Sequence, residues 1–368
     1  MTVCVTGGTG FIGGHVARLE SQKGPVRVTF RSEERLERLQ ELEVEPVRAD
    51  TMDRAALRRA FRGCELVYHT AGYVGSRPPD RVWKVNALGP RMAVEAAAAE
   101  GLERIVVTSS VAGIGPAQPG EVGSEDDVYR AGGLGLTYAD AKHEGESQAL
   151  AAGARLGIEV VVVNPSYVFG VPVDRSQPGE TSNRAIGNYL RGRLPAVVDG
   201  QTNVADIRDV AAGHLKAAER GKPGERYVLG GHDIGWVELL ERVAEISRVR
   251  YALLVLPPEI AQVARVAETL PMPELIAPEA FVLMAQNWRF SSRKAKRELG
   301  YRVRALNTTL RDTIEWYREL MESGAFDGRS ASTMSLAAVG VRLAQRTGLL
   351  GGLRTVGRYV GRRLVSGA

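Results

Sequence analysis

The chain has 368 residues, of which 44% are hydrophobic and 25% are charged. This composition is typical of a folded globular protein, argues against disordered and membrane-spanning classes, and leaves room for two domains. Seven arginines and no acidic residue lie between Arg329 and Ala368, so the net charge of +5 resides in this segment and the residues before it are net acidic. The basic charge therefore gives no support to nucleic-acid binding by the folded body.

The N-terminal residues indicate the cellular location, and the cysteines and histidines indicate whether a metal site is expected. An apolar run begins at Val3 with no basic leader before it, which predicts a cytoplasmic protein. Cys4 and Cys64 lie outside any Cys-x-x-Cys or metal-ligand pattern, so we expect both to fill apolar space. The histidines are scattered without ligand spacing, at His15, His69, His143, His214 and His232. We therefore expect no metal site.

Short β-branched runs alternate with amphipathic stretches through the first half of the chain. Strands are expected at residues 3–6, 26–30, 44–47, 66–69, 105–108 and 160–163. Helices are expected from Phe11 and at residues 87–100 and 137–156. Apolar strands that alternate with helices indicate a parallel sheet covered on both faces. The predicted fold class is therefore α/β, with a Rossmann-type doubly wound parallel sheet.

Beyond Pro165 this rhythm gives way to loops that contain glycine and proline. The elements expected there are a return helix near residues 209–218, a strand at 226–229, a helix from Trp236 and a final helix at 306–321. Residues 257–278 form an apolar stretch that prolines interrupt, and no uninterrupted apolar run reaches the roughly 18 residues of a spanning helix. We expect this part to form a smaller mixed α/β region.

A glycine-rich segment, Gly7-x2-Gly10-x2-Gly13, lies between the first strand and the helix that begins at Phe11. Glycines at this spacing permit a tight turn, let the backbone approach a pyrophosphate and allow the helix to pack on the strand. The N-terminus of the helix then faces the anion. The alternative is an ordinary strand-to-helix turn. The placement predicts a dinucleotide-binding loop formed by Thr6, Gly7, Gly10, Phe11, Ile12 and Gly13.

The residues after the second strand indicate which dinucleotide binds. Phe30 is followed by Arg31 and Ser32, without the acidic residue that binds the ribose hydroxyl of NAD. A cation and a hydroxyl suit a 2′-phosphate, so NADP is favoured over NAD. A position of Arg31 on the adenine ring or in solvent is the alternative. Asp50 follows the third strand and is placed to accept a hydrogen bond from the adenine amino group, unless it is an exposed loop residue.

Tyr138 and Lys142 have i, i+4 spacing, so their side chains project from one face of the expected helix. A phenol with a pKa of about 10 is a poor acid-base catalyst near neutrality, and a fixed ammonium group beside it favours the phenolate. The fifth strand ends in Thr108-Ser-Ser110, at the carboxyl edge where open α/β sheets bind ligands. Ser110 is assigned to donate to the substrate oxygen, with Ser109 as the alternate.

Together these residues resemble the extended short-chain dehydrogenase/reductase family, also described as the NAD-dependent epimerase/dehydratase superfamily. The resemblance covers about residues 1–322 and rests on the glycine loop, His69-Thr-Ala71, Asn86 in Val85-Asn-Ala-Leu-Gly89, Thr108-Ser-Ser110, the Tyr138 and Lys142 pair, and residues 164–170. Within that family the chain is most similar to the branch of dihydroflavonol-4-reductase-like proteins, 3β-hydroxysteroid dehydrogenases and hopanoid-associated sugar epimerases. Residues 164–166, 208–214, 224–231 and 290–301 resemble the last of these groups.

The resemblance implies an NAD(P)-dependent oxidoreductase in which hydride moves between nicotinamide C4 and a carbinol or carbonyl carbon while Tyr138 handles the proton. It implies that Asn86 supports the active-site backbone, so the predicted catalytic set is Tyr138, Lys142, Ser110, Ser109 and Asn86. It also implies that Pro165 and Ser166 line the nicotinamide pocket and that Ala71 touches the cofactor. The remaining expected cofactor-binding residues are Thr51, Thr70, Gly72, Lys142 and Val168.

Two segments depart from the family pattern. Gly89-Pro-Arg-Met92 stands where the family usually has Gly-Thr-x-Asn, which puts the role of that helix in doubt. Val111-Ala112 replaces the Ala-Thr of sugar-nucleotide epimerases, which removes one hydroxyl from the site.

These assignments divide the chain into three expected parts. Residues 1–170 form a dinucleotide-binding domain that carries the catalytic residues, and a helix at 205–220 returns to it. Residues 171–204 and 221–328 form the substrate-binding region. Residues 329–368 form a basic amphipathic tail.

The substrate is expected to be hydrophobic. Residues 257–288 are apolar, and either line the cleft or belong to the core. No arginine cluster clearly matches a diphosphate clamp, although Arg184, Arg191 and Arg193 are candidates for one. The predicted function is therefore interconversion of a secondary alcohol and a ketone on a lipophilic substrate. An NAD-dependent sugar or sugar-nucleotide epimerase and a non-catalytic dinucleotide sensor are the alternatives.

Apolar residues recur every three to four positions over residues 353–364, interleaved with Arg354, Arg358 and Arg362. This pattern is typical of a basic amphipathic helix that lies on an anionic membrane surface, here expected at its inner face. A solvated or partner-packing helix is the alternative, and a homodimer is a further expectation.

Overall fold

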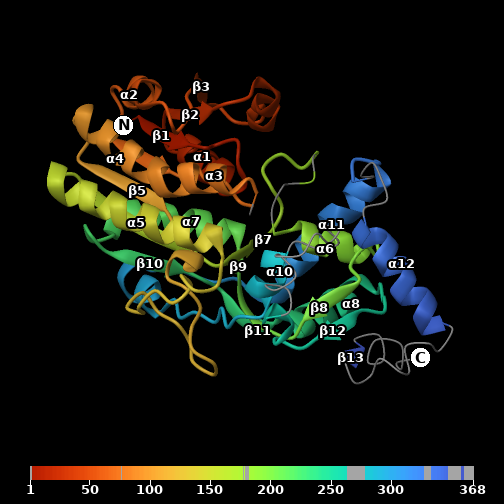
Figure 1. Cartoon of the computed structure of the whole chain (residues 1–368). Coiled ribbons are helices and arrows are strands. Elements are labelled where there is room, and N and C mark those ends of the chain that lie inside the picture. The colour runs from red at the N-terminus through yellow and green to blue at the C-terminus, as the bar shows by residue number, and fades with distance from the viewer. Residues whose placement is uncertain are drawn as a thin grey trace.

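The computed structural model describes residues 2–75, 77–176, 178, 182–262, 278–326, 333–346 and 358–359. Its centre is a seven-stranded sheet with the order β10-β6-β5-β4-β1-β2-β3, in which all neighbours are parallel. The strands are β1 (Val3–Thr6), β2 (Val26–Phe30), β3 (Glu45–Arg48), β4 (Leu66–His69), β5 (Arg104–Thr108), β6 (Glu159–Pro165) and β10 (Arg226–Leu229). Helices cover both faces (Figure 1). The predicted doubly wound α/β fold is confirmed.

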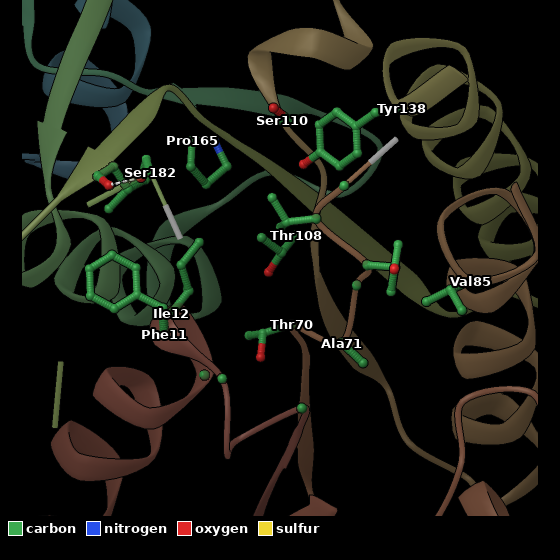
Figure 2. Close-up of a pocket in the computed structure, with 18 of the residues that line it drawn as sticks. Phe11, Ile12, Thr70, Ala71, Val85, Thr108, Ser110, Tyr138, Pro165 and Ser182 are labelled. Atoms are coloured by element: carbon green, nitrogen blue, oxygen red, sulfur yellow. Dashed lines mark hydrogen bonds between the residues drawn. The ribbon is translucent and has the colours of Figure 1, made fainter. Parts of the chain in front are cut away.

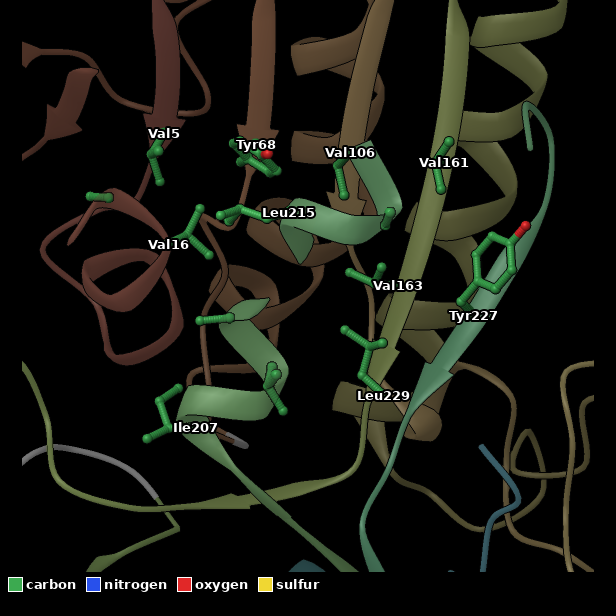
Figure 3. Close-up of a cluster of buried hydrophobic side chains, with 14 of the residues drawn as sticks. Val5, Val16, Tyr68, Val106, Val161, Val163, Ile207, Leu215, Tyr227 and Leu229 are labelled. Carbon is green, nitrogen blue, oxygen red and sulfur yellow. The ribbon is translucent and has the colours of Figure 1, made fainter. Parts of the chain in front are cut away.

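Side-chain alternation along the strands builds a core on each face of this sheet. One core packs on α1 (Phe11–Ser21) and α7 (Ile207–Arg220), and its strand residues include Val5, Tyr68, Val106, Val163 and Leu229 (Figure 3). The other core packs on α2 (Arg54–Phe61), α4 (Gly89–Ala99) and α5 (Thr137–Leu156). Because successive strand residues point to opposite faces, Val3 and Val5 belong to the first core and Cys4 to the second.

The strand boundaries expected from the sequence agree closely with this sheet. The strand expected at 44–47 is Glu45–Arg48, and the one expected at 160–163 extends over Glu159–Pro165. The helix expected at 87–100 begins later, because α3 (Pro79–Trp83) runs through a π-helical turn, Lys84–Leu88, into α4. Pro90 has no N–H to donate to the carbonyl of residue 86, which accounts for the widened turn at this point.

The region after Pro165 is more regular than expected. Residues predicted as loops form β7 (Tyr167–Phe169) and β9 (Gln201–Asp206), which pair in one small sheet with β11 (His232–Gly235). A second small sheet contains β8 (Ala196–Val198), β12 (Leu254–Leu256) and β13 (Arg358–Tyr359). The loop prediction was wrong because strands this short show too little alternation, and their partners lie far along the chain.

Helices complete this second part. They are α6 (Arg184–Leu190), α8 (Trp236–Ser247), α10 (Pro278–Met284), α11 (Leu306–Glu322) and α12 (Thr333–Arg346); short turns lie at Glu33–Leu39, Val111–Gly113 and Ala295–Leu299. A separate aromatic core, which includes Tyr189, Trp236, Trp316 and Tyr317, joins β7, β8, β9 and β12 to α6, α8 and α11. We call β7–β9, β11, β12, α6, α8, α10 and α11 the small-sheet region, and the seven-stranded sheet with α1, α2, α4, α5 and α7 the large-sheet region.

The tail is described only in part. Helix α12 lies within it, whereas most of the second amphipathic stretch expected at 353–364 lies outside the described residues. Arg358 and Tyr359 do not continue a helix there but form β13, antiparallel to β12. In the described part of the chain no helix has the length and apolar character needed to cross a membrane.

Candidate active site

The glycine loop folds tightly against the end of β4. Gly7 has a φ of 66°, and a Cβ there would lie 2.7 Å from the Cα of Ala71. A Cβ on Gly13 would lie 2.4 Å from both the carbonyl oxygen of Gly7 and the hydroxyl of Thr70. These distances exclude a side chain at either position, so the two glycines allow the backbone to close over the edge of the sheet.

The N-terminus of α1 opens onto the cavity beside this loop. Gly10 is its N-cap and supplies no side-chain hydrogen bond, so the first amides of the helix are not capped by their own N-cap residue. Free amides at a helix N-terminus, together with the helix dipole, attract an anion. The donor set therefore fits the pyrophosphate of a dinucleotide.

The cavity has a volume of about 1360 Å³ and extends along the carboxyl edge of the large sheet into the small-sheet region. Single-ligand pockets usually span about 300–1000 Å³, so this one has room for a dinucleotide and a second molecule. Figure 2 shows Phe11, Ile12, Thr70, Ala71, Ser110, Tyr138 and Pro165 surrounding it. The expected cofactor-binding residues that line it are Gly7, Gly10, Phe11, Ile12, Gly13, Arg31, Ser32, Asp50, Thr51, Thr70, Ala71, Gly72, Lys142, Pro165, Ser166 and Val168.

Thr6 lies behind this lining. It is fully buried, its hydroxyl pairs with His69 Nδ1 at 2.9 Å, and it accepts a bond from the amide of Ala71 at 3.3 Å. Its position supports the loop through β4, whereas the sequence assigned it to the cofactor-contacting set.

The end of the cavity next to β2 is rich in arginine. Arg31 and Ser32 line it as expected, and so do Arg35 and Arg38, which the sequence analysis did not single out. The guanidinium of Arg38 donates to the carbonyl of Thr9 at 3.5 Å, which draws it toward the glycine loop. Arg35 and Arg38 are three residues apart, which places both on one face of the 3₁₀ turn Glu33–Leu39. Glu34 also lines this end, so the charge there is mixed.

Asp50 is held by a local bond at the same end of the cavity. Its Oδ1 accepts from the amide of Met52 at 2.8 Å, and no pairing with another part of the described chain holds it. The second oxygen of this carboxylate remains a suitable acceptor for an adenine amino group.

Tyr138 and Lys142 project from α5 toward the end of β5. The ammonium group of Lys142 donates to the carbonyl of Thr108 at 3.1 Å and lies 5.9 Å from the ring centre of Tyr138. Burial lowers the pKa of Lys142 to about 8, while the nearby Glu146 carboxylate acts against this decrease. Burial raises the pKa of Tyr138 to about 12, and a hydrogen bond with Ser110 opposes the increase. The tyrosine is therefore protonated before any ligand binds.

The two candidate serines differ in their surroundings. Ser110 accepts from the amide of Ala112 at 3.1 Å, and its hydroxyl opposes the increase in the pKa of Tyr138. Ser109 also lines the cavity, but its hydroxyl is buried without a partner among the described residues. This effect on the pKa of Tyr138 distinguishes Ser110 from Ser109.

Asn86 lies behind the cavity on the π-helical turn. Its amide donates to the carbonyl of Tyr73 at 2.8 Å and its oxygen accepts from the amide of Tyr73 at 3.0 Å. These two hydrogen bonds with the backbone of Tyr73 hold the loop that follows β4. Gly72 of this loop faces Lys142. The geometry is that of a backbone support, as the resemblance implied.

Apolar side chains from the small-sheet region close the far end of the cavity. The rings of Tyr167 and Trp236 meet edge to face with centres 4.8 Å apart. The residues that share this end are Leu136, Tyr167, Trp236, Leu283, Met284 and Trp288. Part of the apolar stretch expected at 257–288 therefore lines the cleft, although residues 263–277 of it lie outside the described residues.

Charged residues also line this part of the cavity, among them Glu279 and Arg184. Arg184 lines the cavity, whereas Arg191 and Arg193 do not; the guanidinium of Arg193 lies 6.0 Å from the ring centre of Phe326 instead. Of the three arginines considered for a diphosphate clamp, one therefore faces the site. Across the described residues, no group of three or more His, Cys, Asp or Glu side chains is arranged to hold a metal ion.

Comparison with known proteins agrees with this geometry. Residues 3–230 match the NAD dependent epimerase/dehydratase family. The chain is 33% identical over 326 residues to a putative dihydroflavonol 4-reductase of Synechocystis sp., a match that covers 85% of this chain and 94% of that protein. It is 30% identical over 330 residues to sterol demethylase protein B of Methylococcus capsulatus, with 87% and 99% covered.

Comparison with solved structures supports the same family. A nucleoside-diphosphate-sugar epimerase from Pseudomonas aeruginosa is 27% identical and superposes with a TM-score of 0.72, covering 87% of this chain and 98% of that one. Since the family match spans most of the large-sheet region and the glycine loop, strand order and Tyr138 pair agree with it, the resemblance inferred from the sequence is confirmed. The chain belongs to the NAD-dependent epimerase/dehydratase family of extended short-chain dehydrogenases/reductases.

Proposed function

We propose that the protein is an NAD(P)-dependent oxidoreductase that interconverts a ketone and a secondary alcohol on a lipophilic substrate. The observation that carries the proposal is the convergence of Tyr138, Lys142 and Ser110 on one side of a cavity whose far end is aromatic and aliphatic. Two relatives matched over nearly their whole length, a putative dihydroflavonol 4-reductase and sterol demethylase protein B, are named for reactions on ring-containing compounds, which supports an apolar substrate.

The bound dinucleotide supplies or accepts a hydride at nicotinamide C4. Residues of this chain line the cavity where the cofactor would bind. The glycine loop and the N-terminus of α1 would hold the pyrophosphate, and Pro165 and Ser166 would border the nicotinamide. Ser110 donates to the substrate oxygen, and the protonated Tyr138 transfers its proton to that oxygen as the carbonyl is reduced. The Lys142 cation then stabilises the phenolate that remains.

For the cofactor, we favour NADP over NAD. Arg31, Arg35 and Arg38 all border the end of the cavity next to β2, where the 2′-phosphate of NADP would lie. Guanidinium groups bind phosphate through two parallel hydrogen bonds, and β2 is not followed directly by an acidic residue. Glu34 at the same end is the feature that supports NAD.

A sugar-nucleotide epimerase is the second candidate. The likeness to a nucleoside-diphosphate-sugar epimerase and the position of Arg184 on the cavity wall favour it. Two features disfavour it: the apolar end of the cavity, and the finding that only Arg184 of the three clamp candidates lines the cavity, whereas a diphosphate needs several donors. A non-catalytic sensor has no need of the Tyr138 and Lys142 pair that the site retains.

Net turnover of the dinucleotide separates these candidates. The purified chain is mixed with NADPH or NADH and, in turn, with a dihydroflavonol, a steroid ketone, UDP-glucose and UDP-galactose. We expect a steady loss of nicotinamide absorbance with one of the apolar carbonyl compounds and faster oxidation of NADPH than of NADH. Interconversion of the UDP-sugars without net dinucleotide oxidation would instead establish the epimerase.

For the tail, we propose peripheral attachment to the inner face of an anionic membrane, supported by its seven arginines and apolar periodicity. Removal of residues 330–368 is expected to release the protein from vesicles of phosphatidylserine and phosphatidylcholine in a sedimentation assay. Equal sedimentation of the full and shortened chains contradicts the proposal. Light scattering of the same two proteins measures whether the expected homodimer forms.

A further inference from the structure

A buried carboxylate lies one helical turn beyond Lys142 on the same face of α5. Glu146 is 3% exposed. A buried carboxylate is costly unless polar partners satisfy both of its oxygens. Arg226 Nη1 donates to its Oε1 at 2.9 Å, and Asn164 Nδ2 donates to its Oε2 at 2.7 Å. The carboxylate is therefore held from two sides, by β10 and by β6.

Asn164 connects this carboxylate to the active site. It is fully buried in β6, and the same amide nitrogen also donates to the backbone carbonyl of Ser110 at 3.0 Å. The two protons of one amide group thus serve two acceptors, Glu146 and Ser110. The Ser110 hydroxyl opposes the increase in the pKa of Tyr138, and both residues face the cavity (Figure 2).

Arg226 fixes the other end of this connection. Its Nε donates to the carbonyl of Glu125 at 2.6 Å and its Nη2 to the carbonyl of Asp127 at 3.3 Å. These bonds leave the guanidinium little freedom, so the Glu146 carboxylate that it holds is fixed as well. Neither Glu146 nor Arg226 lines the cavity.

Resting on the proposed function, we propose that Glu146 is a positioning residue for catalysis. Held by Arg226, its carboxylate orients the Asn164 amide, and that amide keeps Ser110 in place to share the substrate oxygen with Tyr138. A second link, from Lys142 to the carbonyl of Thr108, ties the same helix to the same strand end. Helix α5, which carries the tyrosine, is thus connected to the segment that carries the serine directly through Lys142 and indirectly through Asn164 of β6.

The test compares Glu146→Gln and Asn164→Leu with Val161→Ala, a matched control that weakens β6 in the core but lies outside the network. Each variant is assayed with the apolar ketone that the wild-type chain reduces fastest, and dinucleotide affinity and thermal midpoint are measured beside kcat and KM. We expect kcat to fall roughly 10- to 100-fold in Glu146→Gln and Asn164→Leu, because a misplaced reacting group slows the chemical step by this order. The dinucleotide Kd is expected to stay within about twofold of the control. The double variant is expected to be no worse than Asn164→Leu alone, because both changes act through one amide.

Crystal structures of wild type and Asn164→Leu give a readout that needs no turnover. We expect the Ser110 and Tyr138 hydroxyls to separate in the variant. An unchanged kcat, a loss that merely follows the thermal midpoint as in Val161→Ala, or an unmoved Ser110 each overturns the proposal. Failure of the proposed function is distinct: wild type then reduces none of the ketones, and the crystal structures alone decide whether Glu146 positions Ser110.

Discussion

The large-sheet and small-sheet regions form their parts of the cavity in different ways. In the large-sheet region the backbone itself forms the wall, through the glycine loop, the uncapped start of α1 and the ends of β4 and β5. In the small-sheet region side chains form the wall, with Tyr167, Trp236 and Leu283 among them. A cavity wall formed by backbone keeps its shape when side chains are substituted, so it binds one kind of ligand. A wall formed by side chains changes shape with each substitution. The first therefore suits a common cofactor and the second a particular substrate.

The largest expected effect falls on the backbone wall. Gly13→Val places carbon atoms where the carbonyl of Gly7 and the hydroxyl of Thr70 already lie, at 2.4 Å from the Cβ position. We expect dinucleotide affinity to fall by more than about 100-fold, because the turn must open to relieve the overlap. Fluorescence titration with NADPH measures it, and Gly133→Ala, whose Cβ would meet nothing within 4 Å, is the control. Equal affinities in the two variants would contradict the close-packed loop.

Acid is expected to weaken the large-sheet region first. Burial lowers the pKa of His69 to about 3, and of His15 and His214 to about 4. Between pH 6.5 and about 4 the unfolded chain binds protons at these histidines and the folded chain does not, so the stability present above pH 6.5 is lost as the pH falls. For His214 alone the loss at pH 4 is about 3 kcal/mol.

Hydrogen exchange at pH 7 and pH 4.5 tests this expectation. Amides of β4, β5 and α7 are expected to lose more protection than those of α8 and α11 on acidification. In His214→Gln the unfolding free energy is expected to depend less steeply on pH over this interval. A uniform loss across both regions, or an unchanged slope in the variant, is incompatible with the buried neutral histidine.

The arginine end of the cavity is expected to give an effect of intermediate size. Arg31→Ala is expected to raise the NADPH dissociation constant roughly 10- to 100-fold, since a charge-assisted bond contributes about 1.5–3 kcal/mol, while the NADH constant changes little. Isothermal titration with both dinucleotides measures the difference. Arg48→Ala, which removes an exposed arginine 4.0 Å from Glu33, serves as the control. An equal increase in the dissociation constants of NADPH and NADH would contradict the assignment of Arg31 to the 2′-phosphate.

The smallest expected effect belongs to the side-chain wall. Leu283→Ala is expected to raise KM for an apolar ketone about threefold to 30-fold through lost apolar contact, with the dinucleotide Kd unchanged. Steady-state kinetics with the best ketone of the panel measures both quantities. Val339→Ala, at an exposed position of α12, is the matched control. A change in dinucleotide affinity instead of KM would remove the distinction between the two walls.

The same contrast explains what the sequence could predict. The large sheet was predictable because its strands are buried on both faces and read as continuous apolar runs, such as Val160 to Val163. The glycine loop and the Tyr138 pair were predictable because their spacing alone brings the groups together. The three-residue strand at Tyr167–Phe169 was not, since its pairing partner Val204 lies far along the chain.

The supporting residues of the site were equally hidden in the sequence. Glu146 follows Lys142 by four residues, which was a visible signal, but its partners Asn164 and Arg226 come from separate strands and only the fold brings them together. Arg35 and Arg38 follow Arg31 closely in the sequence, but residues 31–38 contain as many glutamates as arginines. The sequence therefore did not show whether the arginines or the glutamates would face the cavity.

The most direct test of the account is the Tyr138→Phe variant, which removes one hydroxyl and keeps the ring. Its dinucleotide dissociation constant and its single-turnover rate of ketone reduction are measured beside those of wild type, with Tyr129→Phe as a control tyrosine that bonds Asp140 instead. The account predicts that reduction falls below detection while the dinucleotide constant stays within a few-fold of wild type. Reduction at the wild-type rate in Tyr138→Phe would contradict it.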